Sequence, residues 1–321
     1  MPVNGAEGRT RVKVAVIGAT GFVGSAAARA LESRGVTVVH VTAPRLPAMP
    51  ASEAEPYIAS SPAHLGHLTS TLRGVDAVVN AAGLPDASST DSEALIAANA
   101  VLPGVVAAAS VRAGVRRLVH VSSAAVQGRL PVLDDTDASD AFSDYARSKL
   151  LGERLARTFG EGSVVTYRPA GVHGPDRRVT RLVSRVASSR LASVASPGTS
   201  PSPQSLVENV ADALAFLVTT SLIPPATVTH PWEGLTTADV MELLGGRNPR
   251  RVPRPVARAV VGAVRTVSRL VPGLAGQARR LEMLWFGQRQ ATSWLERAGW
   301  TPPLGRTAWA ELGRTVRGQV S

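Results

Sequence analysis

The chain has 321 residues, of which 44% are hydrophobic and 18% are charged, and it contains no cysteine. This composition supports a globular core and excludes both disulfides and thiolate metal sites. The formal net charge of +11 would suit a nucleic-acid-binding protein. However, residues 1–244 carry 21 basic and 21 acidic side chains, and the whole excess lies in residues 245–321, with 14 Arg and 3 Glu. No recognition motif accompanies it, and we expect no nucleic-acid partner.

Neither a leader nor a membrane span is expected. Residues 1–11 are polar and lack the apolar segment of a signal peptide. No later run approaches the roughly 18 uncharged apolar residues that span a bilayer. Together with the lack of cysteine, this favours a cytoplasmic protein.

Strands and helices alternate along the first half of the chain. Short runs rich in β-branched residues predict strands over residues 12–17, 36–41, 75–80, 117–121 and 164–168. Helices are predicted over residues 25–34 and about 93–112, ended by Gly35 and Gly114. From Val207 onward the chain is mostly helical. The alternation predicts an α/β fold, a Rossmann-type doubly wound parallel sheet with a smaller, mainly helical C-terminal region.

The first strand is followed by the segment Gly18-Ala-Thr-Gly21-Phe-Val-Gly24, directly before a helix. Glycines let the backbone turn tightly and approach a pyrophosphate, and the helix N-terminus points its N–H groups at the phosphates. This context predicts a dinucleotide site for NAD(P). The expected cofactor contacts in this loop are Gly18, Thr20, Gly21, Phe22, Val23 and Gly24.

A second motif, Tyr145-Ala-Arg-Ser-Lys149, uses one of three Tyr and one of two Lys in the chain. Residues i and i+4 share a helix face, so the lysine cation can lower the pKa of the phenol from its usual value of about 10. The phenol could then exchange a proton near neutral pH. Ser123 follows the strand 117–121, at the end of the sheet where ligands bind, and is expected to bind a substrate carbonyl.

These motifs resemble those of the extended short-chain dehydrogenase/reductase family, the group of NAD-dependent epimerases and dehydratases. The matching positions are Gly18, Gly21, Gly24, 80–83, Asn99, Ser122, Ser123, Tyr145, Lys149, 168–175, 206–212 and 294–302. The resemblance implies that Tyr145 is the general acid/base, that Lys149 binds the nicotinamide ribose and that Ser123 binds the reacting oxygen. It also implies cofactor contacts from Ala81, Asn99 and Pro169.

The resemblance implies an NAD(P)-dependent enzyme that transfers a hydride at a hydroxyl or keto carbon, preferably of a nucleotide sugar, by epimerisation, dehydration or keto reduction. Three positions depart from the family pattern. Gln127 and His173 stand where Tyr is frequent, and Gly171 stands where nucleotide-sugar members commonly carry Asn. The alternative is therefore a hydroxysteroid-like or other lipophilic alcohol. A non-catalytic dinucleotide-sensing regulator is disfavoured because the Ser123, Tyr145 and Lys149 set is complete.

Cofactor choice is indicated at the end of the second strand, which reads His40-Val-Thr-Ala-Pro-Arg45 and offers no carboxylate to a ribose 2′-hydroxyl. Arg45 could bind a 2′-phosphate instead, so NADP is slightly favoured over NAD. No metal site is expected, because His64 and His67 fall in a predicted loop with no carboxylate nearby. The acidic run 134–140 is predicted to be a solvated loop.

The predicted domains follow from these motifs. Residues 1–175 form the NAD(P)-binding Rossmann domain, and residues 205–232 return to it. Residues 176–204 and 233–321 form the substrate-binding region.

The excess charge is concentrated in the predicted helix 254–270. Arg254, Arg258, Arg265 and Arg269 project to one side of this helix. We favour a solvated arginine face over a rim for an anionic substrate or a peripheral contact with anionic lipid. The expected partners are a small, anionic substrate and a second copy in a homodimer.

Overall fold

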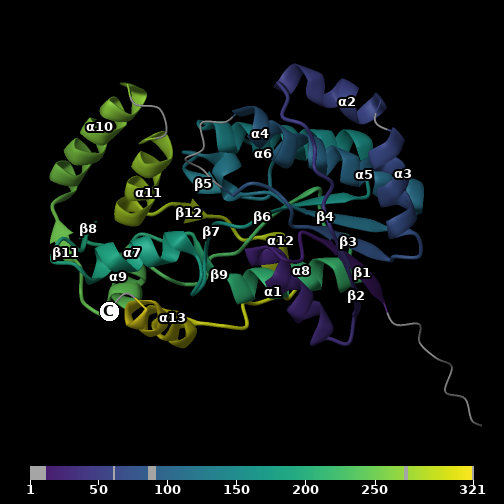
Figure 1. Ribbon diagram of the computed structural model, residues 1–321. Coiled ribbons are helices and arrows are strands. Elements are labelled where there is room, and N and C mark those ends of the chain that lie inside the picture. The colour runs from purple at the N-terminus through teal and green to yellow at the C-terminus, as the bar shows by residue number, and fades with distance from the viewer. Residues whose placement is uncertain (1–11, 61, 86–91, 271–273, 320–321) are drawn as a thin grey trace, which may run out of the picture.

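The computed structural model describes residues 12–60, 62–85, 92–270 and 274–319. Its centre is a six-stranded, entirely parallel sheet (Figure 1). In spatial order the strands are β2 (Thr37–Val41), β1 (Lys13–Ile17), β3 (Ala77–Asn80), β4 (Arg117–Val121), β6 (Val164–Arg168) and β10 (Thr227–Thr229). The predicted α/β class and doubly wound sheet are confirmed.

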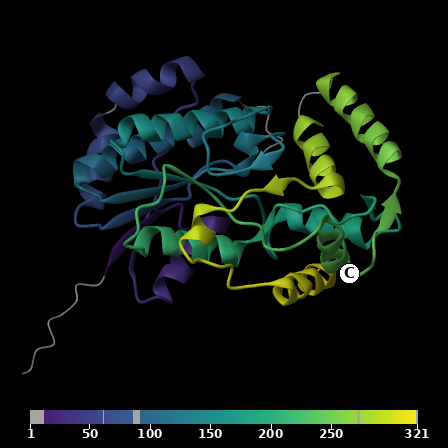
Figure 2. The same ribbon diagram turned by 180° about the vertical axis from the view of Figure 1, so that it is seen from behind.

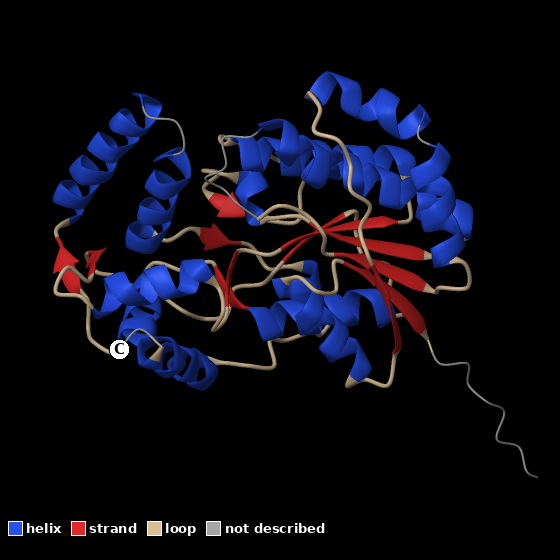
Figure 3. Cartoon of the chain, in the orientation of Figure 1, coloured by secondary structure: helices blue, strands red, loops and turns tan. Residues whose placement is uncertain are grey.

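Helices cover both faces of the sheet, as Figure 3 shows. One face packs against α1 (Phe22–Glu32), α8 (Val207–Thr219) and α12 (Trp294–Arg297). The other packs against α2 (Ala54–Ser60), α3 (Pro62–Leu72), α5 (Leu102–Ala113) and α6 (Asp144–Phe159). Side chains alternate along a strand. Val14 and Val16 therefore enter the core with α1, and Ala15 and Ile17 enter the opposite core with α5.

The apolar helical run before β4 is interrupted by a wider turn. It consists of α4 (Ser92–Ile96), a π-helical turn over Ala97–Val101, and α5, and Gly114 ends it in the left-handed conformation. This run is long and apolar enough to cross a membrane, contrary to the sequence-based expectation that no such segment exists. Because 78% of its most apolar stretch is buried inside the protein, it is a core helix of the fold.

The order in which strands are added to the sheet reverses between β1 and β3, because β2 lies on one side of β1 and all later strands of the sheet lie on the other. In open α/β sheets such a reversal opens a crevice at the carboxyl ends of the strands. Between β2 and β3 the chain forms η1 (Ala51–Glu53), α2 and α3. His64 and His67 therefore lie on a helix, and their prediction as loop residues is wrong.

The C-terminal region has its own core at one end of the sheet (Figures 1 and 2). It is built by α7 (Arg178–Ser188), α9 (Thr237–Gly245) and α13 (Arg306–Gly318). Trp309 of α13 is buried in this core. Its paired strands are β8 (Ser193–Ala195) with β11 (Arg250–Val252). Beyond them α10 (Arg254–Leu270) and α11 (Leu274–Phe286) form the outermost hairpin.

Two further parallel pairs connect this region to the sheet. They are β7 (Gly171–His173) with β9 (Gln204–Leu206), and β5 (Val132–Leu133) with β12 (Arg289–Gln290). Residues 205–232 return to the sheet as α8 and β10. So does part of the tail, because Leu295 and Trp300 are buried in the same core as α1.

The acidic run 134–140 is a loop in which residues 136–140 are exposed, as predicted, but its carboxylates also make structural contacts. Asp135 accepts hydrogen bonds from the Thr229 backbone N–H at 2.8 Å and from the Trp294 backbone N–H at 2.6 Å. Asp137 pairs with Arg157 at 2.8 Å. The run therefore joins the sheet edge to α6 and α12.

Candidate active site

The three glycines after β1 each solve a different steric problem. Gly18 has φ +83°, and a Cβ there would lie 2.8 Å from the Ala82 backbone N. A Cβ on Gly24 would lie 2.1 Å from the Gly18 carbonyl oxygen, so α1 could not pack against the loop. Gly21 is the N-cap of α1 and donates its N–H to the Gly18 carbonyl at 2.9 Å. The loop is therefore held tightly against the start of the helix.

The N-terminus of α1 suits a pyrophosphate. Within this described segment no side chain caps it and its first turn holds no acidic residue. Gly21, Phe22 and Val23 line a cavity of about 610 Å³. Uncapped N–H groups and the positive end of a helix dipole favour an anion at this position. The residues present thus fit the phosphates of a dinucleotide.

The predicted catalytic residues reach the same cavity from other elements. Ser123 follows β4, and its hydroxyl accepts a hydrogen bond from the Ala125 backbone N–H at 3.2 Å. Tyr145 and Lys149 lie in the first turns of α6, which begins after the N-cap Ser143. The cavity also reaches the C-terminal region, so it lies between the sheet and α7 and α11. The chemistry predicted from separate motifs is gathered in one place.

The phenol of Tyr145 has two cationic neighbours that the sequence did not indicate. Burial raises its pKa above the ordinary value, while a hydrogen bond with Ser123 and the positive charges of Arg177 and Arg280 lower it. The phenol is therefore protonated at neutral pH. That Lys149 lowers this pKa stays a prediction, and both side chains line the same cavity.

Lys149 is held deep beside the strand ends. Its ammonium donates to the Val121 carbonyl at 3.1 Å, and a Cβ on Gly83 would lie 3.2 Å from Nζ. Burial lowers the pKa of Lys149 to about 8, and the negative charge of Glu153 opposes that shift. Lys149 remains charged at neutral pH and reaches the cavity beside Tyr145.

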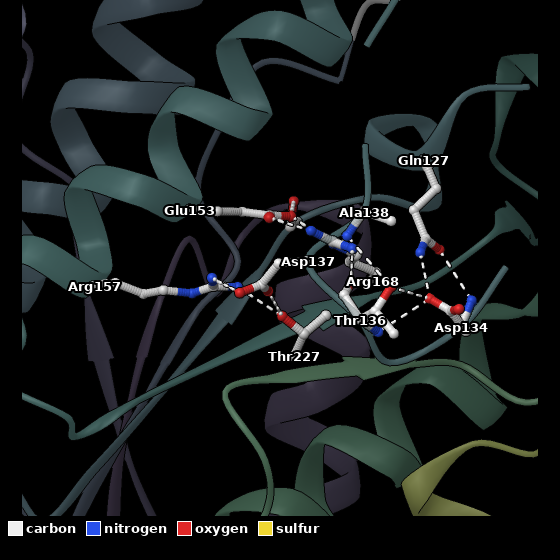
Figure 4. A network of polar contacts seen from close by, with 10 residues as sticks. Gln127, Asp134, Thr136, Asp137, Ala138, Glu153, Arg157, Arg168 and Thr227 are labelled. Carbon is white, nitrogen blue, oxygen red and sulfur yellow. Dashed lines mark hydrogen bonds and ion pairs between the residues drawn. The ribbon is translucent and has the colours of Figure 1, made fainter. Parts of the chain in front are cut away.

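Glu153 belongs to the polar network drawn in Figure 4. It forms a buried two-point ion pair with Arg168, with distances of 2.9 Å from Nε and 2.6 Å from Nη2. Ser122 donates to Glu153 at 2.5 Å, and Arg168 donates to the Thr136 carbonyl at 2.9 Å. The network ties α6 to the ends of β4 and β6, and so fixes Tyr145 relative to Ser123.

The family model for the NAD dependent epimerase/dehydratase family matches residues 14–223. The chain belongs to this family. It is an NAD(P)-dependent enzyme of the epimerase/dehydratase type, as the sequence predicted. No curated protein matches the sequence.

Solved structures of this family share the fold along almost the whole chain. MoeE5 in complex with UDP-glucuronic acid and NAD is 22% identical over 96% of this chain and 99% of that chain, with a TM-score of 0.64. UDP-glucuronic acid 4-epimerase from Bacillus cereus in complex with NAD is 17% identical over 97% and 100%, with a TM-score of 0.66. A dTDP-4-dehydrorhamnose reductase from Bacillus anthracis str. Ames in complex with NADP is 15% identical over 96% and 99%, with a TM-score of 0.61.

The remaining residues predicted to contact the cofactor do not all lie at the cavity. Ala81 and Pro169 line the cavity. Asn99 is fully buried. Its side-chain amide accepts a hydrogen bond from the Leu84 backbone N–H at 2.9 Å and donates one to the Leu84 carbonyl at 3.1 Å, and so it fixes the loop after β3. Arg45 is exposed outside the cavity, on the segment that follows β2.

The departures from the family pattern have structural reasons. A Cβ on Gly171 would already lie 2.2 Å from Gln204 Oε1, so the amide of Gln204 fills the space of a side chain at 171. His173 binds that same amide oxygen through Nε2 at 2.7 Å, and burial lowers the pKa of His173 to about 4. Gln127 is buried and bonds Asp134 at 2.9 Å. The cavity wall thus still carries a polar amide, which comes from Gln204 on β9 instead of from an Asn at position 171 on β7.

The substrate end of the cavity is mainly apolar. Its wall there includes Leu133, Phe142, Val179, Leu182, Val183, Val186 and Leu284. Arg177 adds charge among them, with its guanidinium 5.0 Å from the ring centre of Phe22. Helix α7 lies within the predicted substrate-binding region 176–204, and its apolar residues recur at helical spacing.

Proposed function

We propose that this enzyme oxidises or reduces a hydroxyl or keto carbon by hydride transfer with NAD(P), while Tyr145 moves the matching proton. The observation that supports this most directly is the convergence of Ser123, Tyr145 and Lys149 on the cavity that begins at the N-terminus of α1. The nicotinamide cofactor supplies or accepts the hydride. Ser123 orients the substrate oxygen, and the phenol of Tyr145 donates a proton to it or accepts one from it.

A nucleotide sugar is the proposed substrate. The similar MoeE5 and Bacillus cereus proteins bind UDP-glucuronic acid or act on it. In this chain Arg177 and Arg280 place positive charge near Tyr145, which suits an anionic substrate. Gln204 offers an amide at the cavity wall in place of the missing Asn.

A lipophilic alcohol is the second candidate, and the apolar wall formed by α7 favours it. Leu182 and Val186 are 43% and 45% exposed, and both face the cavity. A hydroxyl-bearing apolar ligand would bury these side chains favourably. The two candidates can be separated by offering UDP-glucuronic acid and a hydroxysteroid to the same preparation.

The substitution Tyr145→Phe tests the mechanism. Because general acid/base catalysis contributes roughly 10²–10⁴-fold to rates, we expect turnover of the accepted substrate to fall by at least about 100-fold. Cofactor binding, measured by titration calorimetry, is expected to remain, since the glycine loop and Lys149 are unchanged. Tyr57→Phe on α2 serves as the control and should retain activity. Undiminished turnover by the Tyr145→Phe variant would overturn the mechanism.

We further propose that NADP binds more tightly than NAD. Val41 at the end of β2 accepts a long hydrogen bond from Gly18 at 3.4 Å, so the segment leading to Arg45 starts beside the glycine loop. Losing a charge-assisted hydrogen bond costs about 1.5–3 kcal/mol, and Arg45→Glu should therefore weaken NADP binding by about 10- to 100-fold. Binding of NAD should change little. An unchanged NADP/NAD affinity ratio would refute the assignment, and Arg112→Glu at the far end of α5 controls for charge.

A further inference from the structure

Three residues on the neighbouring strands β7 and β9 depend on one another. The strands pair in parallel, and Gly171 lies beside Gln204. Because side chains alternate along a strand, His173 projects on the same side of β7 as position 171. A Cβ at Gly171 would lie 2.2 Å from Gln204 Oε1, so only glycine leaves room for the amide that binds His173 Nε2 at 2.7 Å. The two departures from the family pattern on β7 therefore accommodate a third residue on β9.

The orientation of the Gln204 amide follows from a chain of buried hydrogen bonds. Thr180 Oγ1 accepts the Gly174 backbone N–H at 3.2 Å, so the hydroxyl hydrogen of Thr180 is left to donate to His173 Nδ1, also at 3.2 Å. Burial lowers the pKa of His173 to about 4, and the neutral ring carries one N–H at physiological pH. Since Nδ1 accepts, that N–H is on Nε2 and donates to Gln204 Oε1. The amide oxygen of Gln204 is thus occupied.

The amide nitrogen of Gln204 is left for a ligand. No residue that the structure describes accepts a hydrogen bond from Nε2, although the Gln204 side chain is only 7% exposed. Gln204 and His173 both line the cavity. Buried N–H groups without an acceptor are costly. A ligand in the cavity therefore gains affinity by placing an acceptor oxygen against this amide.

The charges around the cavity select the kind of acceptor. The cations that line it are Lys149, Arg177, Arg279 and Arg280, and none of its described lining residues is an aspartate or glutamate. Arg177 is close enough to His173 that its positive charge lowers the pKa of the ring further, beyond the larger effect of burial. Glu233 also acts on His173, but its carboxylate is fully buried on the Trp309 indole and is not in the cavity wall. The cavity thus favours an anionic acceptor over a neutral one.

We propose that Gln204 is a specificity-determining residue, whose amide N–H groups bind an oxyanion of the substrate, either a phosphate or a carboxylate. His173 and Thr180 are positioning residues, because they act on the substrate only through the orientation of this amide. The inference rests on the proposed function in that it takes the cavity to be the substrate site. A neutral, apolar alcohol leaves both N–H groups unpaired and is disfavoured.

Binding of two pairs of probes to the enzyme saturated with NAD(P) tests the proposal. UDP carries a diphosphate that uridine lacks, and UDP-glucuronic acid carries a carboxylate that UDP-glucose lacks. Titration calorimetry gives an anionic-to-neutral affinity ratio for each pair. We expect a ratio of at least about tenfold in one pair, and that pair identifies phosphate or carboxylate as the group bound. Ratios near one in both pairs, or no binding of either anionic probe, would overturn the proposal.

Substitutions at Gln204 assign the ratio to this residue. Gln204→Leu removes both donors and should lower the ratio by about tenfold. Gln204→Glu keeps an acceptor for His173 Nε2 but presents a carboxylate to the ligand, and should lower the ratio at least as far. Gln319→Leu, at an exposed position just beyond α13, is the matched control and should keep the wild-type ratio. A wild-type ratio in the Gln204 variants would refute the assignment. If Gln204→Leu does not fold, Gln204→Glu alone decides.

Substitutions at Thr180 test the positioning role. Thr180→Val resembles threonine in shape but lacks the hydroxyl, so nothing fixes the tautomer of His173 and the amide of Gln204 is free to turn. The ratio should fall in this variant, and Thr180→Ser, which keeps the hydroxyl, should restore it. A merely structural role would weaken binding of anionic and neutral probes alike and leave the ratio unchanged. Loss of the ratio in both variants, or in neither, would refute the positioning role.

Turnover is measured on the same variants, so that this inference and the proposed function fail separately. The probes need only bind. A lowered ratio in Gln204→Leu without hydride transfer by the wild-type enzyme would contradict the proposed function alone. Hydride transfer by wild type with an unchanged ratio in the Gln204 variants would contradict this inference alone. Far-UV circular dichroism and cofactor affinity should match wild type in every variant compared.

Discussion

Lys149 illustrates the cost of a buried charge at a functional position. Its pKa falls from 10.5 to about 8 because burial disfavours the ammonium. At pH 7 the folded state therefore holds a charge whose burial costs about 3 kcal/mol. Lys149→Met removes that cost, and Glu153 keeps its partner Arg168. We expect the variant's free energy of unfolding at pH 7 to rise by up to about 3 kcal/mol, while cofactor affinity falls.

The pH dependence of this difference follows from the direction of the shift. Between about pH 8 and 10.5 the unfolded chain binds a proton at Lys149 that the folded chain does not. Wild-type stability therefore rises with pH in this window and approaches that of the Met variant. Urea unfolding at several pH values measures both curves, with Lys13→Met as the matched control. A Met variant less stable than wild type at pH 7 would contradict the assignment of the cost to burial.

At the scale of elements, local signals predicted the long segments well. The strands at 117–121 and 164–168 have the predicted bounds, because β-branched runs between polar turns are determined by nearby residues. The helix carrying His64 and His67 was missed, since Gly66 and Pro62 are signals of a loop in sequence while Leu65, Leu68 and Leu72 bury one face in the structure. Strands of only two or three residues, such as β8 and β11, are too short to show an alternating hydrophobic pattern in the sequence. Each forms only because a distant strand pairs with it.

The site was predictable where its chemistry lies in a contiguous motif. The glycine loop and the Tyr145/Lys149 pair have fixed spacing, and the structure brings both to one cavity. Arg177 and Arg280 are more than a hundred residues apart in the sequence, and only the fold brings the charge of each near Tyr145. In a chain with so many arginines, neither stands out by residue type. Convergence of distant side chains requires the three-dimensional fold.

At the scale of the whole molecule, Glu233 joins the sheet to the C-terminal region. Its carboxylate accepts hydrogen bonds from His230 at 3.1 Å, the Leu206 backbone N–H at 3.0 Å and the Trp309 indole at 2.9 Å. Tyr167 on β6 extends the chain of contacts through His230 at 2.5 Å. One buried carboxylate therefore connects the edge of the sheet, β9 and α13.

Glu233→Ala should weaken this junction severely, because it leaves the Trp309 indole and the Leu206 backbone N–H buried without an acceptor. Breaking a buried network in this way costs roughly 3–5 kcal/mol, a large part of the stability of an ordinary domain. Urea unfolding at neutral pH provides the measurement. Glu311→Ala on the same helix as Trp309 is the control, since that carboxylate is 63% exposed and should matter by less than about 0.5 kcal/mol. Equal stabilities of the two variants would show that Glu233 does not hold the two parts together.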